Sequence, residues 1–300
     1  MKATGWLSGW GSAARWGGTL CATALAWTVV GTVQPASAQE GGGEGWTIDH
    51  TWTDTARVRF TVDEGTWLNV DVSPDGRTIV FDLLGDIYTM PIDGGEATRI
   101  SGGPAFEFHP RFSPDGSRIA FVSDRDGMNN IWTMAPDGSD ATQVTAERER
   151  DVNSPEWSAD GEHILVRKHF VFSRSLGAGE IWMYHRTGGS GLQVTDRPNE
   201  QQDQGEPAVS PDGVWVYYSQ DVTPGPLFQY NKDPNPGIYA ILRRHLVTGE
   251  QETVTRRPGG SITPMPHPDG RRLAFIRRVR EKTVLFVKDL ESGAEWPVFD

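Results

Sequence analysis

The chain has 300 residues, a formal net charge of −12 and a single cysteine. This acidic balance argues against nucleic acid and anionic lipid as partners. The 35 glycines and 20 prolines favour many turns over long helices.

Residues 1–38 are predicted to be a cleavable secretory signal peptide. An uncharged, largely apolar run over 16–33 is followed by "ASA" at 36–38, which is typical of a small-residue cleavage site. The run is also just long enough to span a bilayer, but no flanking charges follow it, as a stop-transfer signal would have. We therefore expect cleavage near Ala38–Gln39 and a periplasmic or secreted chain without stable membrane insertion. Because Cys21 lies in the signal, the mature chain would contain no cysteine.

Residues 39–56 are expected to form a linker and residues 57–300 a single repeat domain. The domain begins with "RVRFTV" at 57–62, in which apolar and polar residues alternate. This segment is predicted to be a strand that closes a ring of sheets by pairing with strands from the other end of the chain.

Five copies of one turn pattern follow. Each copy begins with a short segment that leads to an Asp-Gly turn and continues with alternating apolar residues. In four of the five copies a proline precedes the Asp-Gly pair. The turn glycines are separated by 40, 45, 52 and 57 residues, which is close to the length of one four-stranded propeller blade. The copies are "VSPDGRTIVF" at 72–81, "FSPDGSRIAF" at 112–121, "WSADGEHILV" at 157–166, "VSPDGVWVYY" at 209–218 and "PHPDGRRLAF" at 266–275.

Each copy continues through an aromatic-rich strand, such as "NIWTM" at 130–134, to a short outer strand, such as "TQVT" at 142–145. The fold class is therefore all-β: a β-propeller of four-stranded antiparallel blades with five blades visible. Radially stacked sheets cover each other's apolar faces, which one sheet alone cannot do. We expect these blades to be part of a ring of six or more, with the closing blade beyond Asp300. The alternatives are a five-bladed ring with an extra strand, and a β-sandwich, which predicts irregular strand spacing.

The repeats are specific enough to suggest a family. The S-P-D-G-x-x-I-x-F pattern followed by I-W or I-Y resembles the WD-like repeats of TolB-type propellers over about residues 57–300. The opening blade at 63–100 is similar to the N-terminal propeller of large secreted bacterial amidohydrolases, and similar repeats precede the catalytic domains of prolyl-oligopeptidase-type and tricorn-type peptidases. The resemblance implies a protein partner, or a catalytic domain of the same protein, and it places any divalent metal in that further domain. No cofactor is expected in this chain.

No pattern for catalysis is complete in the sequence. The seven histidines include neither a His-x-His pair nor a His-Glu-x-x-His motif, and "GGSGL" at 188–192 has leucine where a nucleophile elbow needs its last glycine. The loop "SDRDGMNN" at 123–130 only partly fits a calcium loop, so a plain hairpin turn is favoured. His163 and His169 are predicted to share one face of a strand, where packing or surface exposure is favoured over a metal pair.

The innermost predicted strand of each copy carries polar residues whose identity varies between the copies, whereas the surrounding repeat pattern is the same. At the fourth and second positions before the turn, these residues face a common axis in a propeller. We hypothesise that they border an axial polar pocket that admits a ligand or a partner segment. The alternative is a solvated channel without a ligand. The candidate residues are Asn69, Asp71, His109, Arg111, Glu156 and Glu206.

A Pro- and Gly-rich insertion at 219–239 separates two strands of the fourth blade. It carries Leu227, Phe228 and Tyr230, which are candidates for a partner-binding loop. A self-packed Ω-loop is the equal alternative.

Three functions remain open from the sequence. The first is a non-catalytic domain of a secreted hydrolase that docks on the catalytic domain and filters or positions substrate. The second is a free-standing periplasmic scaffold of TolB type. The third, catalysis in the channel, lacks a matched nucleophile, base and orienting group.

Overall fold

The computed structural model describes residue 48 and residues 60–170, 178–224 and 237–298. The chain divides into two compact units, residues 1–44 and 45–300, and every described residue belongs to the second unit. The expected signal peptide and nearly all of the expected linker therefore lie outside the described residues. No helix in the described ranges is long and apolar enough to cross a membrane.

Twenty strands form five four-stranded sheets in the described residues. Blade 1 contains β1 (Val70–Val72), β2 (Thr78–Leu83), β3 (Asp86–Pro91) and β4 (Thr98–Ser101). Blade 2 contains β5 (Glu107–Phe112), β6 (Ile119–Ser123), β7 (Asn130–Met134) and β8 (Thr142–Gln143). Blade 3 contains β9 (Arg150–Trp157), β10 (His163–Phe170), β11 (Glu180–His185) and β12 (Gly188–Gln193). Blade 4 contains β13 (Gln204–Val209), β14 (Trp215–Asp221), β15 (Tyr239–His245) and β16 (Gln251–Thr253). Blade 5 contains β17 (Ile262–Pro266), β18 (Arg272–Val279), β19 (Lys282–Asp289) and β20 (Glu295–Pro297).

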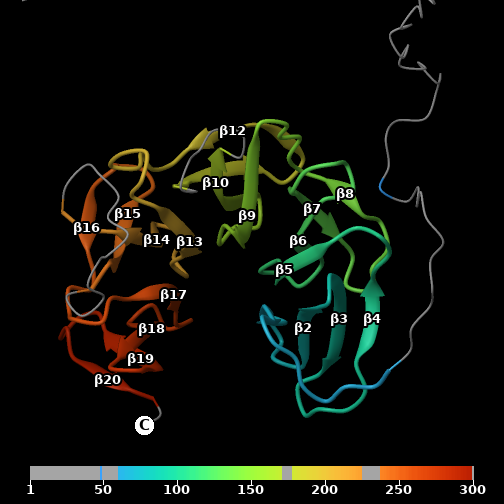
Figure 1. The fold of residues 1–300 in the computed structure, drawn as a ribbon, viewed down its shortest axis with the longest axis horizontal. Coiled ribbons are helices and arrows are strands. Elements are labelled where there is room, and N and C mark those ends of the chain that lie inside the picture. Colours follow the sequence, from blue (N-terminus) through green and yellow to red (C-terminus); the bar gives the residue numbers. More distant parts are fainter. Residues whose placement is uncertain (1–47, 49–59, 171–177, 225–236, 299–300) are drawn as a thin grey trace, which may run out of the picture. The chain divides into compact units, whose positions relative to one another are not determined.

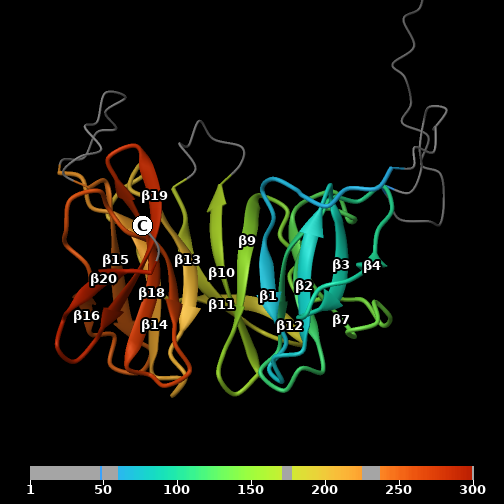
Figure 2. The ribbon, with the colours of Figure 1, turned by 90° about the horizontal axis from the view of Figure 1, so that it is seen from below.

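The sheets have the connectivity of a β-propeller. Within each sheet, strands consecutive in the chain pair antiparallel, in the order first to fourth. The first strands of neighbouring sheets contact one another in turn, β1 with β5, β5 with β9, β9 with β13 and β13 with β17, and they lie on the inner side in Figure 1. Figure 2 shows the same sheets from the side. The predicted fold class of four-stranded antiparallel blades is confirmed.

The repeated turn is held by its own side chains. In blade 2, Ser113 Oγ donates to Asp115 Oδ1 at 2.6 Å and accepts from the backbone N–H of Arg118 at 2.9 Å. Gly116 has φ of +70°, in the left-handed region that glycine enters without steric cost. The hydrogen bonds from Ser113 and Ser117 lower the pKa of Asp115 to about 2. The repeated acidic residue therefore stabilises the hairpin turn.

Apolar clusters fill the space between neighbouring blades. Between blades 1 and 2, Val80 and Ile87 pack against Ile119, Phe121 and Met134, all of them fully buried. Equivalent clusters join blades 2 and 3, blades 3 and 4, and blades 4 and 5. Burying such side chains contributes roughly 1.5–3 kcal/mol each, so inter-blade packing is the main stabilising term of the fold.

The repeated Val-Thr after the outer strand also has a structural role. Thr145 Oγ1 accepts a hydrogen bond from the backbone N–H of Ile131 at 2.8 Å, and Thr195 does the same for Ile181 at 3.0 Å. Both hydroxyl-bearing side chains are buried. The threonine thus satisfies a backbone donor that the short outer strand leaves unpaired.

The predicted closing strand at 57–62 is not formed in its described part. Residues 57–59 lie outside the described residues, and Phe60, Thr61 and Val62 belong to no strand. Phe60 and Val62 are 63% and 48% exposed, so neither has the cover that a paired strand would supply. Among the described residues, no strand of blade 1 pairs with a strand of blade 5. A ring of six or more blades stays a prediction.

Candidate functional site

The innermost strands of blades 2 to 5 share a β-bulge at the predicted axial positions. In each strand, the pairing register breaks at a residue that precedes a proline and has a left-handed conformation. Proline has no N–H to donate to the ladder, which explains the break at this point. The four left-handed residues are His109 (φ 54°), Ser154 (52°), Glu206 (53°) and Thr263 (55°).

A left-handed conformation costs a residue other than glycine roughly 1–2 kcal/mol, and hydrogen bonds to the preceding blade offset this cost. The N–H of His109 donates to Asp82 Oδ2 of blade 1 at 2.8 Å. The N–H of Ser154 donates to His109 Nδ1 of blade 2 at 3.2 Å. The bulges of blades 2, 3 and 5 therefore tie their blades to the one before, and the bonds to the carboxylates of Asp82 and Glu206 contribute about 1.5–3 kcal/mol each.

Asp82 is the centre of the first of these ties. Its carboxylate accepts from the backbone N–H of Asn69 at 2.9 Å, from Asn69 Nδ2 at 2.7 Å and from His109 N–H. Asp82 is only 4% exposed. Asp82 is not among the residues predicted from the sequence, although a lone carboxylate inside the apolar strand "TIVFDL" was a usable signal.

Glu206 forms the corresponding tie between blades 4 and 5. Its Oε2 accepts from Ser219 Oγ at 2.5 Å and from the N–H of Thr263 at 2.8 Å. Three of the predicted axial residues, Asn69, His109 and Glu206, are thus engaged in hydrogen bonds within or between blades.

The other three predicted residues come together one step further along the inner strands. Asp71 of blade 1 accepts the backbone N–H of Phe112 of blade 2 at 2.8 Å. Arg111 of blade 2 donates from NH1 to the carbonyl of Val70 at 3.1 Å, and its Nε lies 3.9 Å from Oε2 of Glu156 of blade 3. The side chains of Arg111 and Glu156 are each 30% exposed, so solvent reaches both charges.

Burial perturbs the ionisation of this axial cluster, which we define as Asp71, His109, Arg111 and Glu156. Desolvation raises the pKa of Glu156 to about 7; nearby Arg111 opposes the rise and Asp71 adds to it. Desolvation also raises the pKa of Asp71, against the pull of Arg111. The pKa of His109 falls to about 4 because of desolvation and the neighbouring Arg111. The imidazole is therefore neutral near pH 7, consistent with Nδ1 accepting from Ser154.

The axial cluster can exchange a proton and bind charge, but it contains no nucleophile paired with a base. Among the described residues, no group of three or more His, Cys, Asp or Glu side chains is arranged to hold a metal ion. Its chemistry suits the recognition of a charged or polar segment, with Arg111 offering donors and the two carboxylates offering acceptors.

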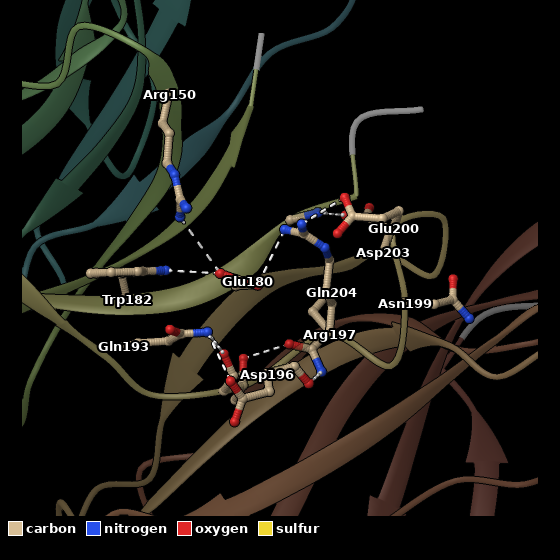
Figure 3. A network of polar contacts seen from close by, with 12 residues as sticks. Arg150, Glu180, Trp182, Gln193, Asp196, Arg197, Asn199, Glu200, Asp203 and Gln204 are labelled. Atoms are coloured by element: carbon tan, nitrogen blue, oxygen red, sulfur yellow. Dashed lines mark hydrogen bonds and ion pairs between the residues drawn. The ribbon is translucent and has the colours of Figure 1, made fainter. Parts of the chain in front are cut away.

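A second polar network links blade 3 to the connection between β12 and β13 (Figure 3). Glu180 Oε1 lies 3.1 Å from NH1 of Arg197, and its Oε2 accepts from Trp182 Nε1 at 3.3 Å. Arg150 NH1 lies 3.7 Å from the same carboxylate, and Arg197 NH2 pairs with Glu200 at 2.8 Å. Because each charge has an opposite neighbour, this network is best explained as structural: it holds the connection after β12 against blade 3.

The two histidines of β10 lie at opposite ends of the strand. His163 makes an edge-on contact with His185, with ring centroids 5.3 Å apart. His169 Nδ1 lies 2.8 Å from NH1 of Arg167, which is itself paired with Asp203 at 2.8 Å. Desolvation and Arg167 lower the pKa of His169 to about 4. The arrangement agrees with the packing interpretation of these histidines. The candidate loop residues Leu227, Phe228 and Tyr230 lie outside the described residues.

Known proteins resemble this chain over its propeller. Residues 71–176 match the family described as the tricorn protease N-terminal beta propeller domain. Tricorn protease homolog 1 of Streptomyces coelicolor is 34% identical over 93 residues, which is 31% of this chain and 9% of that protein. The uncharacterized peptidase YuxL of Bacillus subtilis is 30% identical over 149 residues, which is 38% of this chain and 22% of that protein. A solved structure of a TolB protein from Agrobacterium tumefaciens superposes with a TM-score of 0.62 at 19% identity, over 77% of this chain and 79% of that chain.

These similarities establish a TolB-like β-propeller, related to the propeller domains of peptidases. The chain spans less than a quarter of the length of either peptidase relative.

Proposed function

We propose that this chain is a non-catalytic propeller domain of a secreted or periplasmic hydrolase, and that its axial cluster admits or rejects substrate or partner segments. The proposal rests on a contrast between two sets of polar residues, those at the β-bulges and those two residues further along the inner strands. Asp82 and Glu206 are occupied by hydrogen bonds that hold the blades together, whereas Arg111 and Glu156 keep solvent-accessible charges at a loose 3.9 Å contact. Arg111 also donates to the carbonyl of Val70, but its side chain and that of Glu156 are each 30% exposed and can therefore be reached by a ligand.

A metal-dependent amidohydrolase is the parent protein we favour, on the similarity of the opening blade at 63–100 to the propellers of such enzymes. The predicted signal peptide supports a periplasmic or secreted location. A tricorn-type or prolyl-oligopeptidase-type peptidase is a second candidate, supported by the match of residues 71–176 and by the two peptidase relatives. A free-standing TolB-type scaffold is a third, supported by the superposition with the Agrobacterium structure.

The test uses the full-length protein and amide substrates of graded length and charge. Arg111→Met and Glu156→Gln remove the axial charges with little change of shape. We expect each variant to change the dependence of kcat/KM on substrate size and charge while the shortest neutral substrate is hydrolysed as before. If the wild-type protein hydrolyses none of these substrates but binds a partner protein, the free-standing scaffold is favoured instead.

The chain offers a matched control for both variants. Glu162, in the turn between β9 and β10, and Arg186, in the turn between β11 and β12, form an ion pair outside the axial cluster, with Arg186 Nε 3.2 Å from Glu162 Oε2. Arg186→Met and Glu162→Gln should leave the substrate profile unchanged. Equal effects of the axial and control substitutions would contradict the proposed role of the axis.

A further inference from the structure

Blade 5 concentrates positive charge on an otherwise acidic protein. Nine of the 28 Lys and Arg residues lie between residues 256 and 288, together with only two acidic residues, although the whole chain carries −12. Two of the nine, Arg277 and Lys288, are not exposed and bind the carboxylate of Glu295, and two, Arg271 and Arg272, lie where the turn after β17 leads into β18. The other five are exposed and belong to two short segments: Arg256, Arg257, Arg278, Arg280 and Lys282.

These two segments lie against each other. The backbone N–H of Arg278, near the end of β18, donates to the carbonyl of Gly259 in the connection between β16 and β17 at 3.3 Å. A Cβ on Gly259 would overlap the carbonyl oxygen of Arg278, so only glycine allows this approach. Gly259 also has φ of +91°, which disfavours any other residue. The basic side chains of both segments are therefore brought to one end of blade 5.

A pocket of about 200 Å³ opens between these segments. Its walls are mainly apolar and come from blades 4 and 5, and Arg278 and Thr283 line one side. The apolar wall residues are Ile238, Tyr239, Ile262 and Ile276. Pockets for drug-sized molecules span about 300–1,000 Å³, so this pocket is better suited to a single large apolar side chain.

The charges around the pocket are only partly neutralised. Arg257 Nε lies 3.2 Å from Oε2 of Glu295, and Arg278 Nε donates to the carbonyl of Arg280 at 2.7 Å. Among the described residues, the side chains of Arg280 and Lys282 have no ion-pair partner. Glu281 is the one acidic residue of the β18–β19 turn. An acidic ligand would therefore meet at least two uncompensated positive charges.

We propose that this basic pocket, which is lined by Ile238, Tyr239, Ile276 and Arg278 and flanked in the chain by Arg280 and Lys282, binds an acidic peptide segment of a partner polypeptide. A large apolar side chain of the segment enters the pocket, and flanking carboxylates contact Arg278, Arg280 and Lys282. The small apolar cavity favours a peptide over a nucleic acid, which offers phosphates but no aliphatic side chain. The net charge of −12 opposes approach to an anionic membrane, whereas a short peptide senses chiefly the local charge.

This inference goes beyond the proposed function because it uses neither the axis nor hydrolysis. Its test is direct binding to the mature chain, measured by fluorescence polarisation. The probe is a labelled peptide, Glu-Asp-Glu-Leu-Asp-Glu, and the comparison peptides carry serine for leucine or lysine for each acidic residue. We expect the acidic leucine peptide to bind, the serine peptide to bind at least about fivefold more weakly, and the lysine peptide not to bind. Raising salt from about 20 to about 300 mM should weaken binding about tenfold or more.

Three variants locate the site. Arg280→Glu with Lys282→Glu should weaken binding more than tenfold, and Thr283→Trp, which narrows the pocket, should remove the preference for leucine. The control Arg77→Glu with Arg271→Glu makes the same change in net charge at equivalent exposed turn positions of blades 1 and 5 and should have less than a twofold effect. Thermal unfolding confirms that each variant is folded.

Several results would overturn the proposal. They are equal loss of binding in the control, no binding of the acidic peptide at about 1 mM, and binding that ignores salt. Binding of the chain to phosphatidylserine vesicles without binding of the peptide would identify a membrane surface instead. Self-association lost only in the Arg280→Glu, Lys282→Glu variant would identify a second copy of the chain.

Discussion

Asp82→Ala tests whether the carboxylate between blades 1 and 2 holds the inner strands together. The substitution removes the acceptor for Asn69 N–H, Asn69 Nδ2 and His109 N–H at once. His109 would remain in a left-handed conformation at φ 54° without the hydrogen bond that offsets its cost.

The magnitude follows from the number of donors left unpaired. A hydrogen bond to a charged group contributes about 1.5–3 kcal/mol, and a buried donor without a partner costs about 1–3 kcal/mol. Removing a buried charge returns part of this loss. We therefore expect the free energy of unfolding to fall by about 3 kcal/mol, or the Tm by roughly 6–12 °C for a domain of this size.

Urea unfolding of the mature chain, followed by tryptophan fluorescence and circular dichroism, measures the change. Asp82→Asn should lose about half as much, because one acceptor oxygen remains. Asp93→Ala, at an exposed turn position of the same blade, is the control and should stay within about 0.5 kcal/mol of wild type. A loss below about 1 kcal/mol for Asp82→Ala would refute the idea that the inter-blade hydrogen bonds hold the bulge.

Three further predictions concern pH, glycine and a buried ion pair. Since the pKa of Glu156 is raised to about 7, the protonated carboxyl stabilises the folded state at low pH, and this stabilisation is lost as pH rises through about 7. The free energy of unfolding of Glu156→Gln should therefore rise by about 1–2 kcal/mol relative to that of wild type between pH 5 and 8. A constant difference across this range would contradict the pKa shift. Gly94 and Gly138 occupy equivalent turns with φ of +89° and +85°, but only at Gly138 would a Cβ meet a neighbour, the carbonyl of Ile100. In chemical unfolding, Gly138→Ala should therefore destabilise the chain by about 1–3 kcal/mol more than Gly94→Ala. Equal losses of stability would show that the blades relax around the contact. Arg277→Met breaks a buried ion pair, in which Arg277 NH1 lies 2.7 Å from Glu295 Oε2. The substitution should lower the free energy of unfolding by about 3–5 kcal/mol in the same assay, with Arg271→Met as the exposed control. A loss equal to that of the control would mean that Lys288 and Arg257 compensate.

Most of the blade architecture was predictable because its signals are local. The bond from Ser113 to Asp115 and the left-handed Gly116 lie within four residues, so one repeat unit contains the whole hairpin. The alternating apolar residues after the turn continue along β6, where Ile119 and Phe121 are buried in the core between blades 1 and 2. The expected strand at 57–62 failed over 60–62 because alternation alone supplies no partner, and a strand needs one.

The axial residues were predictable as positions but not as roles. Counting back from the turn identified His109 and Glu206, yet both are engaged in hydrogen bonds with a neighbouring blade. Asp82 was missed because it lies on the second strand of blade 1, whereas the positions compared between the five repeats lie on the innermost strands. The network around Glu180 was also missed, since its members come from scattered positions of blade 3 and of the connection after β12.

The sequence by itself determined the blade: its turns, its strand order and the faces that become buried, because these depend on residues close together in the chain. Only the tertiary structure decided which polar residues stabilise the ring and which remain available. Asp82 and His109 are 27 residues apart, and Glu206 and Thr263 are 57 apart. Such contacts arise only when blades pack side by side, and the tertiary structure likewise places Gly259 against Arg278 and creates the basic pocket between blades 4 and 5.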